Sequence, residues 1–254
     1  MVCCPRKHQG QLLFLNAGDA DFEYLNFLRR FDCEINMRTF FNVAWNTIPC
    51  RYRVSVDIYR RYQYWKNAGA IFIHVPKVAG VSVSSALYGR PLGHFRAVDV
   101  RQILPRAFET LLTFGIVRDP LKRLLSAYRF AIAGGGEKMK IKNPSKYQSS
   151  EFRSFASFVS EWLIYQERNR LDGIFKPQNF FLCDCNEIIV DHWFNLDSLN
   201  EGMEIVGSKL GQAIPLEHLN RTFGRSNWDI DRDTIDLVQR YYADDYEIFG
   251  FSFA

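Results

Sequence analysis

Two pairs of an apolar run and a following helical segment constrain the fold of this chain more than any other feature. In the first pair, the run Ile71–Val75 lies between a glycine and a proline. A short, continuous apolar run of this kind suits a buried parallel strand. The segment Val81–Tyr88 then reads as a helix, closed by the glycine and proline that follow it.

The second pair repeats this order. The apolar run Leu111–Val117 is followed by Asp119, a good helix N-cap, and by Pro120, a good first helical residue. We therefore expect a helix over Leu121–Ala133. Two strand–helix units in succession predict a βαβ arrangement, so the fold class is α/β, with a central parallel sheet flanked by helices in a single domain.

The remaining segments predict further elements. Phe152, Phe155 and Phe158 have the spacing of a helix face that packs into the core. The predicted elements outside the two pairs are helices over Val54–Asn67, Glu151–Arg170 and Asp233–Asp245, and strands over Phe180–Leu182 and Glu187–Val190.

Length and charge narrow the class of protein. The 254 residues suit one large α/β domain. No run of about 18 apolar residues is present, so we expect no transmembrane segment. The apolar run Leu12–Leu15 is too short for a signal-peptide core, which predicts a cytoplasmic protein. A net charge of +4 is mild, and nucleic-acid binders usually show a stronger or more clustered excess, so no nucleic-acid partner is predicted.

The cysteines do not predict a metal site. The six cysteines include no C-x-x-C pair, and zinc sites usually need two such pairs or a pair with histidines. We expect ordinary reduced thiols and no metal.

The loop after the first strand predicts an anion site. Lys77 is followed by Val78, Ala79, Gly80, Val81 and Ser82, which lead into the first helix. Backbone N–H groups of such a loop can close around phosphate oxygens, and the helix dipole favours an anion there. A P-loop NTPase places its lysine late, in G-x-x-x-x-G-K-[ST], and no GK[ST] occurs in this chain. An ATP-dependent kinase is therefore disfavoured.

A second cation follows the second strand. Arg118 ends the run Leu111–Val117, and Ser126 lies on the next predicted helix. Ligands of open parallel sheets gather at the carboxyl ends of the strands, so we expect Arg118 to face the same crevice as Lys77. There Arg118 can form bidentate hydrogen bonds with a phosphate, and the Ser126 hydroxyl can donate a further hydrogen bond to it. The alternative is that Arg118 pairs only with Asp119 or another carboxylate.

At this point the chain resembles a known family. The segment 72–82 is similar to the 5′-phosphosulfate loop of the carbohydrate sulfotransferases of the family 2 type, and segment 114–129 resembles their 3′-phosphate motif. Segments 177–182 and 242–251 are also similar to the family. The resemblance covers residues 70–252, which predicts one domain over 1–254 with residues 1–69 as an N-terminal elaboration without a motif match.

The resemblance implies a fold related to nucleotide kinases, which binds the co-substrate 3′-phosphoadenosine 5′-phosphosulfate (PAPS) and releases 3′,5′-ADP. It implies that Lys77 contacts the bridging oxygen of the phosphosulfate, and that Arg118 and Ser126 bind the 3′-phosphate. It also implies that the amides from Ala79 to Ser82 bind the 5′-phosphate. The family usually has a hydroxyl residue in place of Val81, and often one in place of Val78. Ser82 and the amides must then make more of the contacts.

The acceptor hydroxyl needs a base, and a neutral imidazole suits that task near pH 7. His94 lies in a segment that resembles the family's Gly-His stretch near the acceptor, so we assign it as the base, with a structural or orienting role as the alternative. We interpret His74 as a core residue, and His218 as a weak candidate for the nucleotide's border. Asp99 and Glu109 stay open as bases.

The sequence thus predicts an enzyme that transfers a sulfuryl group from PAPS to a hydroxyl of an acceptor, by resemblance a carbohydrate. A non-catalytic module that binds a nucleotide or a sulfated glycan is the first alternative, because of the two valines in the loop. A phosphotransferase of the nucleotide-kinase kind is the second.

Overall fold

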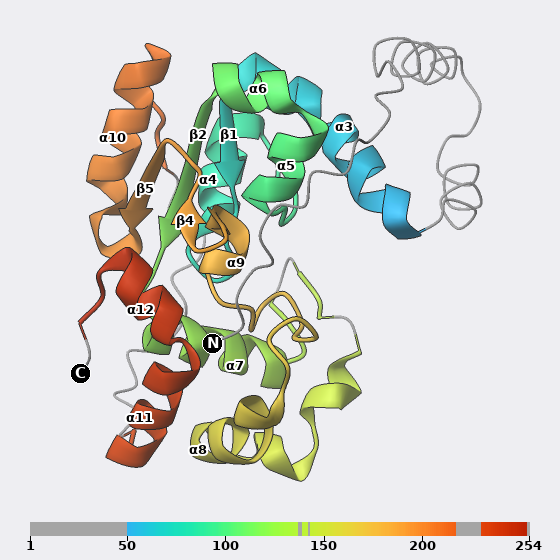
Figure 1. Cartoon of the computed structure of the whole chain (residues 1–254), viewed down its shortest axis with the longest axis vertical. Coiled ribbons are helices and arrows are strands. Elements are labelled where there is room, and N and C mark those ends of the chain that lie inside the picture. The colour runs from blue at the N-terminus through green and yellow to red at the C-terminus, as the bar shows by residue number, and fades with distance from the viewer. Residues whose placement is uncertain (1–49, 137–138, 142, 217–229, 253–254) are drawn as a thin grey trace, which may run out of the picture. The chain divides into compact units, whose positions relative to one another are not determined.

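Three parallel strands form the central sheet (Figure 1). The structure is a computed structural model and describes residues 50–136, 139–141, 143–216 and 230–252. The strands β1 (Ala70–Ile73), β2 (Leu112–Val117) and β5 (His192–Asn195) lie in the order β1-β2-β5. Ile73 pairs with Gly115, so the first two strands end at the same edge of the sheet. The predicted α/β class and parallel sheet are confirmed.

Helices flank this sheet. α10 (Leu199–Leu210) packs beside β5, and α4 (Gly80–Tyr88) follows β1 (Figure 1). The predicted helices at 54–67, 81–88 and 121–133 are confirmed within a few residues. The other α-helices of the described residues are α3 (Cys50–Ala68), α5 (Ala97–Ile103), α6 (Pro105–Thr110), α7 (Pro120–Ile132), α8 (Phe155–Ser157), α9 (Asn179–Leu182), α11 (Arg232–Tyr241) and α12 (Ala243–Phe249). Short 3₁₀ turns cover Pro144–Tyr147, Ser150–Phe152, Leu163–Tyr165 and Leu196–Ser198, and a π-helical turn covers Phe158–Trp162.

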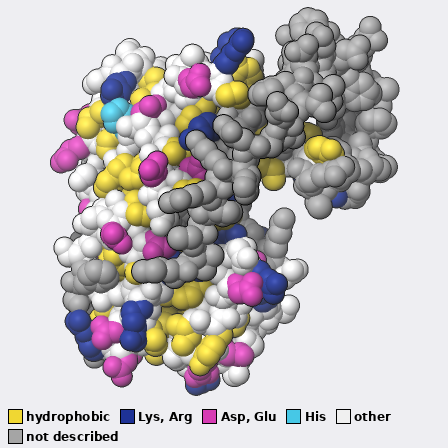
Figure 2. Space-filling view, in the orientation of Figure 1, with side chains coloured by type: hydrophobic (Ala, Val, Ile, Leu, Met, Phe, Trp, Pro, Cys, Tyr) yellow, Lys and Arg dark blue, Asp and Glu magenta, His cyan; other side chains and the backbone are white. Residues whose placement is uncertain are grey.

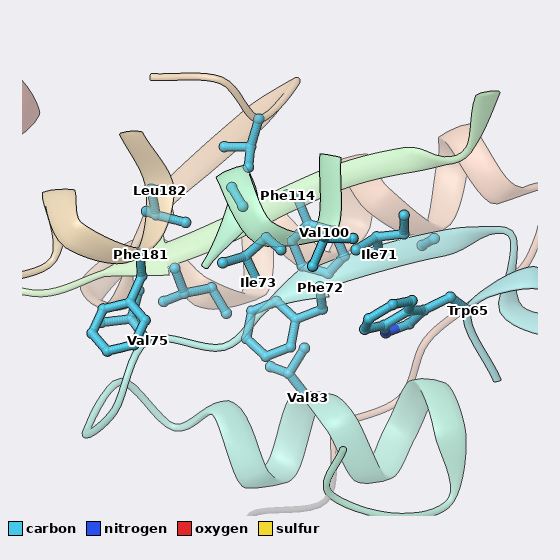
Figure 3. Close-up of a cluster of buried hydrophobic side chains, with 14 of the residues drawn as sticks. Trp65, Ile71, Phe72, Ile73, Val75, Val83, Val100, Phe114, Phe181 and Leu182 are labelled. Carbon is cyan, nitrogen blue, oxygen red and sulfur yellow. The ribbon is translucent and has the colours of Figure 1, made fainter. Parts of the chain in front are cut away.

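One apolar core lies around the sheet (Figure 3). Phe72 on β1 stacks on Phe114 of β2 with ring centroids 5.0 Å apart, and Val83 of α4 points toward Phe72 (Figure 3). On β2, Gly115 leaves room for Leu182, since a Cβ there would lie 2.4 Å from the Leu182 Cδ2. This packing fixes α4 and α9 against the sheet.

A second core lies between α7, the segment 152–163 and α11. Phe152, Phe155 and Phe158 are buried there around Tyr128, as predicted. The predicted continuous helix over 151–170 is wrong. Because Ser154 Oγ accepts a hydrogen bond from the Ser157 N–H (3.0 Å), helical structure restarts at residue 155, and it ends by residue 165.

Two further predictions need correction. Residues 180–182 are helical rather than a strand, and only Glu187–Ile188 (β4) of the predicted strand 187–190 pairs, with β3 (Cys183–Asp184). A run of three apolar residues does not distinguish a helix from a strand. The predicted helix 233–245 is two helices that meet at Tyr242, whose buried hydroxyl donates to the Phe175 carbonyl (2.6 Å).

The sequence also missed β5. Its position is set by Asp191, whose Oδ2 accepts hydrogen bonds from the N–H and the hydroxyl of Thr113 (2.8 Å each). Thr113 and Asp191 are far apart in sequence, so no local pattern marks this strand.

Within the described ranges, no helix has the length and apolarity needed to cross a membrane. On the face shown in Figure 2, basic and acidic side chains are interspersed over the described residues. The predicted single domain over 1–254, with residues 1–69 as an elaboration, stays a prediction, because residues 1–49 lie outside the described part of the chain.

Candidate active site

The loop between β1 and α4 has the backbone conformation of an anion cradle. Lys77 (φ 72°) and Ala79 (φ 61°) are both left-handed, and they lie on either side of Val78. Such alternation turns successive N–H groups toward one side. Among the backbone hydrogen bonds of the described residues, none is donated by the N–H groups of residues 79–81, whereas the Ser82 N–H donates to the Ala79 carbonyl (3.1 Å). Ser82 therefore offers its hydroxyl rather than its amide.

Close packing holds this loop in place. A Cβ at Gly80 would lie 1.9 Å from the His74 Cδ2, so only glycine fits beside the buried imidazole. Val78 is fully buried in the core, whereas Val81 is half-buried at the start of α4. The two valines thus have different surroundings: a hydroxyl at position 78 would be buried in the core, whereas one at position 81 would be partly exposed.

Lys77 is a partly desolvated cation. Its Nζ lies 4.1 Å from the centroid of the Phe130 ring on α7. Burial and, to a lesser extent, the positive charge of Arg118 together lower the pKa of Lys77 to about 8. The fold thus brings Lys77 and Arg118 within electrostatic range of each other. That both face one ligand crevice stays a prediction.

Arg118 lies between β2 and α7. Burial lowers the pKa of Arg118, while the carboxylates of Asp197 and Asp119 oppose that shift. Asp119 is the predicted N-cap of α7, and its Oδ1 accepts a hydrogen bond from the Lys122 N–H (2.8 Å). Ser126 is buried on α7, two turns after Arg118.

His94 lies at the edge of this site. Its Nδ1 is 2.8 Å from the His74 carbonyl oxygen. A carbonyl can only accept, so Nδ1 carries the proton and Nε2 keeps a lone pair for an acceptor's proton. Burial lowers the pKa of His94, the hydrogen bond to His74 raises it, and the charge of Lys77 lowers it. The lowered pKa favours the neutral imidazole near pH 7, in the tautomer that a base needs.

The alternative bases are less well placed. His74 is buried, as predicted, and burial holds its pKa well below the usual range. Its backbone carbonyl contacts the candidate base by accepting a hydrogen bond from His94 Nδ1. Asp99 lies 3.7 Å from Arg96, and Glu109 is exposed on α6. His218 lies outside the described residues.

Two nearby features were not predicted. Gln178 is fully buried and hydrogen-bonds the backbone of Arg118, and its one signal in the sequence was the resemblance of segment 177–182. A hollow of about 320 Å³ lies by Arg96 and Phe180, whose ring centroid is 4.7 Å from the Arg96 Cζ. It includes neither Lys77 nor Arg118, so it is separate from the anion loop.

Anion-binding groups at the carboxyl edge of a parallel sheet are the usual arrangement in α/β proteins that bind phosphorylated ligands, and the fold and loop define that class. Within it, the chain belongs to the sulfotransferase family, since the family's model matches residues 61–252. No curated protein and no solved structure matches the chain significantly. Membership confirms the predicted family and fold, and it supports sulfuryl transfer as the activity.

Proposed function

We propose that this sulfotransferase uses PAPS and sulfates a hydroxyl group of a carbohydrate. The observation that carries the proposal is the loop after β1, where Lys77 precedes the amides of residues 79–81, which donate to no backbone acceptor of the described residues, while Arg118 follows the adjacent strand. Amides and two cations suit a ligand with phosphates at two positions. The carbohydrate rests on the resemblance of the motifs to enzymes of that kind.

The residues of the loop fit PAPS in a defined way. The N–H groups of residues 79–81 hold the 5′-phosphate at the start of α4, together with the Ser82 hydroxyl. Arg118 and Ser126 bind the 3′-phosphate, the group that distinguishes this co-substrate from ATP. Bound PAPS supplies an activated sulfuryl group.

Transfer requires one proton movement and one charge to be stabilised. His94 Nε2 takes the proton of the acceptor hydroxyl as its oxygen forms a bond to sulfur. The bond between sulfur and the bridging oxygen breaks, and the protonated Lys77 stabilises the charge on the departing 3′,5′-ADP. A pKa of about 8 keeps most Lys77 side chains charged at pH 7.

The test combines binding and turnover. Thermal stabilisation should be measured with 3′,5′-ADP and with ATP–Mg²⁺, followed by transfer from labelled PAPS to a panel of glycans and small hydroxyl compounds. Stabilisation by 3′,5′-ADP together with labelled glycan supports the proposal. Binding without transfer to any acceptor favours the non-catalytic module, and preference for ATP–Mg²⁺ favours a phosphotransferase.

A further inference from the structure

Gln178, which is buried, forms two hydrogen bonds with the backbone of Arg118, the arginine assigned to the 3′-phosphate. The Arg118 N–H donates to Gln178 Oε1 (2.9 Å), and Gln178 Nε2 donates to the Arg118 carbonyl (2.8 Å). Only one orientation of the amide satisfies both contacts, so the donor and the acceptor are assigned without ambiguity. These two hydrogen bonds link two segments that lie 60 residues apart.

Gln178 is itself held from a third segment. Asp245, fully buried on α12, accepts a hydrogen bond from the Gln178 N–H and one from the Asn179 N–H (2.8 Å each). Burial raises the pKa of Asp245, while the charge of Arg123 and the two hydrogen bonds lower it. The Asp245 carboxyl group therefore caps α9 and fixes the position of Gln178, which binds the backbone of Arg118.

The other side of this junction is tied to the same segment. Arg123 on α7 is fully buried and donates to the carbonyls of Ile174 (3.3 Å) and Lys176 (2.8 Å). The start of α7 is thus joined to residues 174–179 both at Arg118 and at Arg123. The hydrogen bonds of Gln178 and Arg123 therefore fix the backbone position of Arg118, from which its side chain extends.

We propose that Gln178 is a positioning residue for the 3′-phosphate. It fixes the backbone of Arg118 so that the Arg118 guanidinium can form bidentate hydrogen bonds with that phosphate, and Asp245 in turn fixes Gln178. This inference rests on the proposed use of PAPS. Gln178 does not touch the ligand. Its effect is selective because Arg118 meets the 3′-phosphate and not the rest of the nucleotide.

The test compares two nucleotides that differ in one phosphate. Gln178→Met keeps the volume of the side chain and removes both hydrogen bonds. We expect affinity for 3′,5′-ADP to fall about tenfold, as for a loosened charge-assisted contact, and affinity for 5′-AMP to stay within about twofold. In an Arg118→Ala background, Gln178→Met should change neither affinity further, because the residue through which it acts is gone.

Gln239→Met is the matched control. Gln239 is also a buried glutamine, but it lies on α11 and its Nε2 has no hydrogen-bond partner within the described residues. The control should leave the preference for 3′,5′-ADP over 5′-AMP unchanged. If Gln178→Met does not fold, Asp245→Asn serves instead, and it should lower the same preference by a smaller factor.

Two outcomes overturn the inference by itself. In the first, the wild type prefers 3′,5′-ADP over 5′-AMP, and the Gln178→Met variant either keeps that full preference or loses affinity for both nucleotides equally. The other is a Gln178→Met effect that adds fully to that of Arg118→Ala. A wild type that binds both nucleotides equally instead removes the proposed 3′-phosphate site, and this inference with it.

Discussion

The pH dependence of sulfuryl transfer tests the roles proposed for Lys77 and His94 in one experiment. His94 acts as a base in its neutral form, and Lys77 acts in its charged form. The rate should therefore rise with pH as His94 loses its proton and fall as Lys77 loses its own. The profile is a bell whose two limbs belong to two named residues.

The structure sets where the limbs lie. Burial and the charge of Lys77 lower the pKa of His94, so the acid limb should lie below the usual histidine value of about 6.5. The pKa of Lys77 is about 8, so half of the lysines are charged at that pH. At pH 9 about a tenth remain charged, so kcat/KM for PAPS should be about tenfold below its plateau.

The assay is kcat/KM for PAPS between pH 5 and 10, since this parameter reports the free enzyme. Lys77→Arg keeps a cation that does not titrate in this range, so a slower enzyme without the alkaline limb is expected. His94→Ala should cut turnover about a hundredfold or more and remove the acid limb, apart from the titration of the substrate's own phosphate near about pH 6.

Specific results would refute this reasoning. An alkaline limb that persists in Lys77→Arg assigns it to another group. A His94→Ala variant with the wild-type rate and profile places the base elsewhere, and Asp99 is then the next residue to test. Lys77→Ala should lower turnover by about two to three orders of magnitude, as for the loss of one electrostatic stabiliser, so near-normal turnover excludes its catalytic role.

Three further predictions concern cofactor affinity and the loop. Arg118→Ala should weaken 3′,5′-ADP binding by about 2 kcal/mol or more with little change for 5′-AMP; equal losses in calorimetry would mean that it acts on the fold. Gly80→Ala should abolish binding of 3′,5′-ADP or folding, because its Cβ would lie 1.9 Å from the His74 ring. Gly173→Ala is the control, since among the described residues no heavy atom beyond its chain neighbours lies within 4 Å of its Cβ. Val81→Thr should fold normally and bind PAPS up to about 1 kcal/mol more tightly, as calorimetry would measure. Val78→Thr buries a hydroxyl in the core and should lower the free energy of unfolding by about 1–3 kcal/mol, as denaturant titration would measure. The same stability loss in both variants would contradict the different burial of the two valines.

Local patterns in the sequence determined the parts of the fold that depend on neighbouring residues. The strand–helix order predicted β1, α4, β2 and α7, because apolar runs and helix caps act over a few residues. Lys77 and Arg118 followed from the same order, since the carboxyl ends of adjacent parallel strands lie at one edge of the sheet. The order of the motifs also carried the resemblance to the family.

Contacts between distant segments decided the rest. β5 depends on Asp191 bonding to Thr113, and α9 depends on the carboxyl group of Asp245, so neither has a complete local signal. The lowered pKa of Lys77 and the tautomer of His94 arise from burial and from a carbonyl brought close by folding. Desolvation and long-range hydrogen bonds exist only once the chain is packed, and for that reason the chemistry of the site belongs to the tertiary structure.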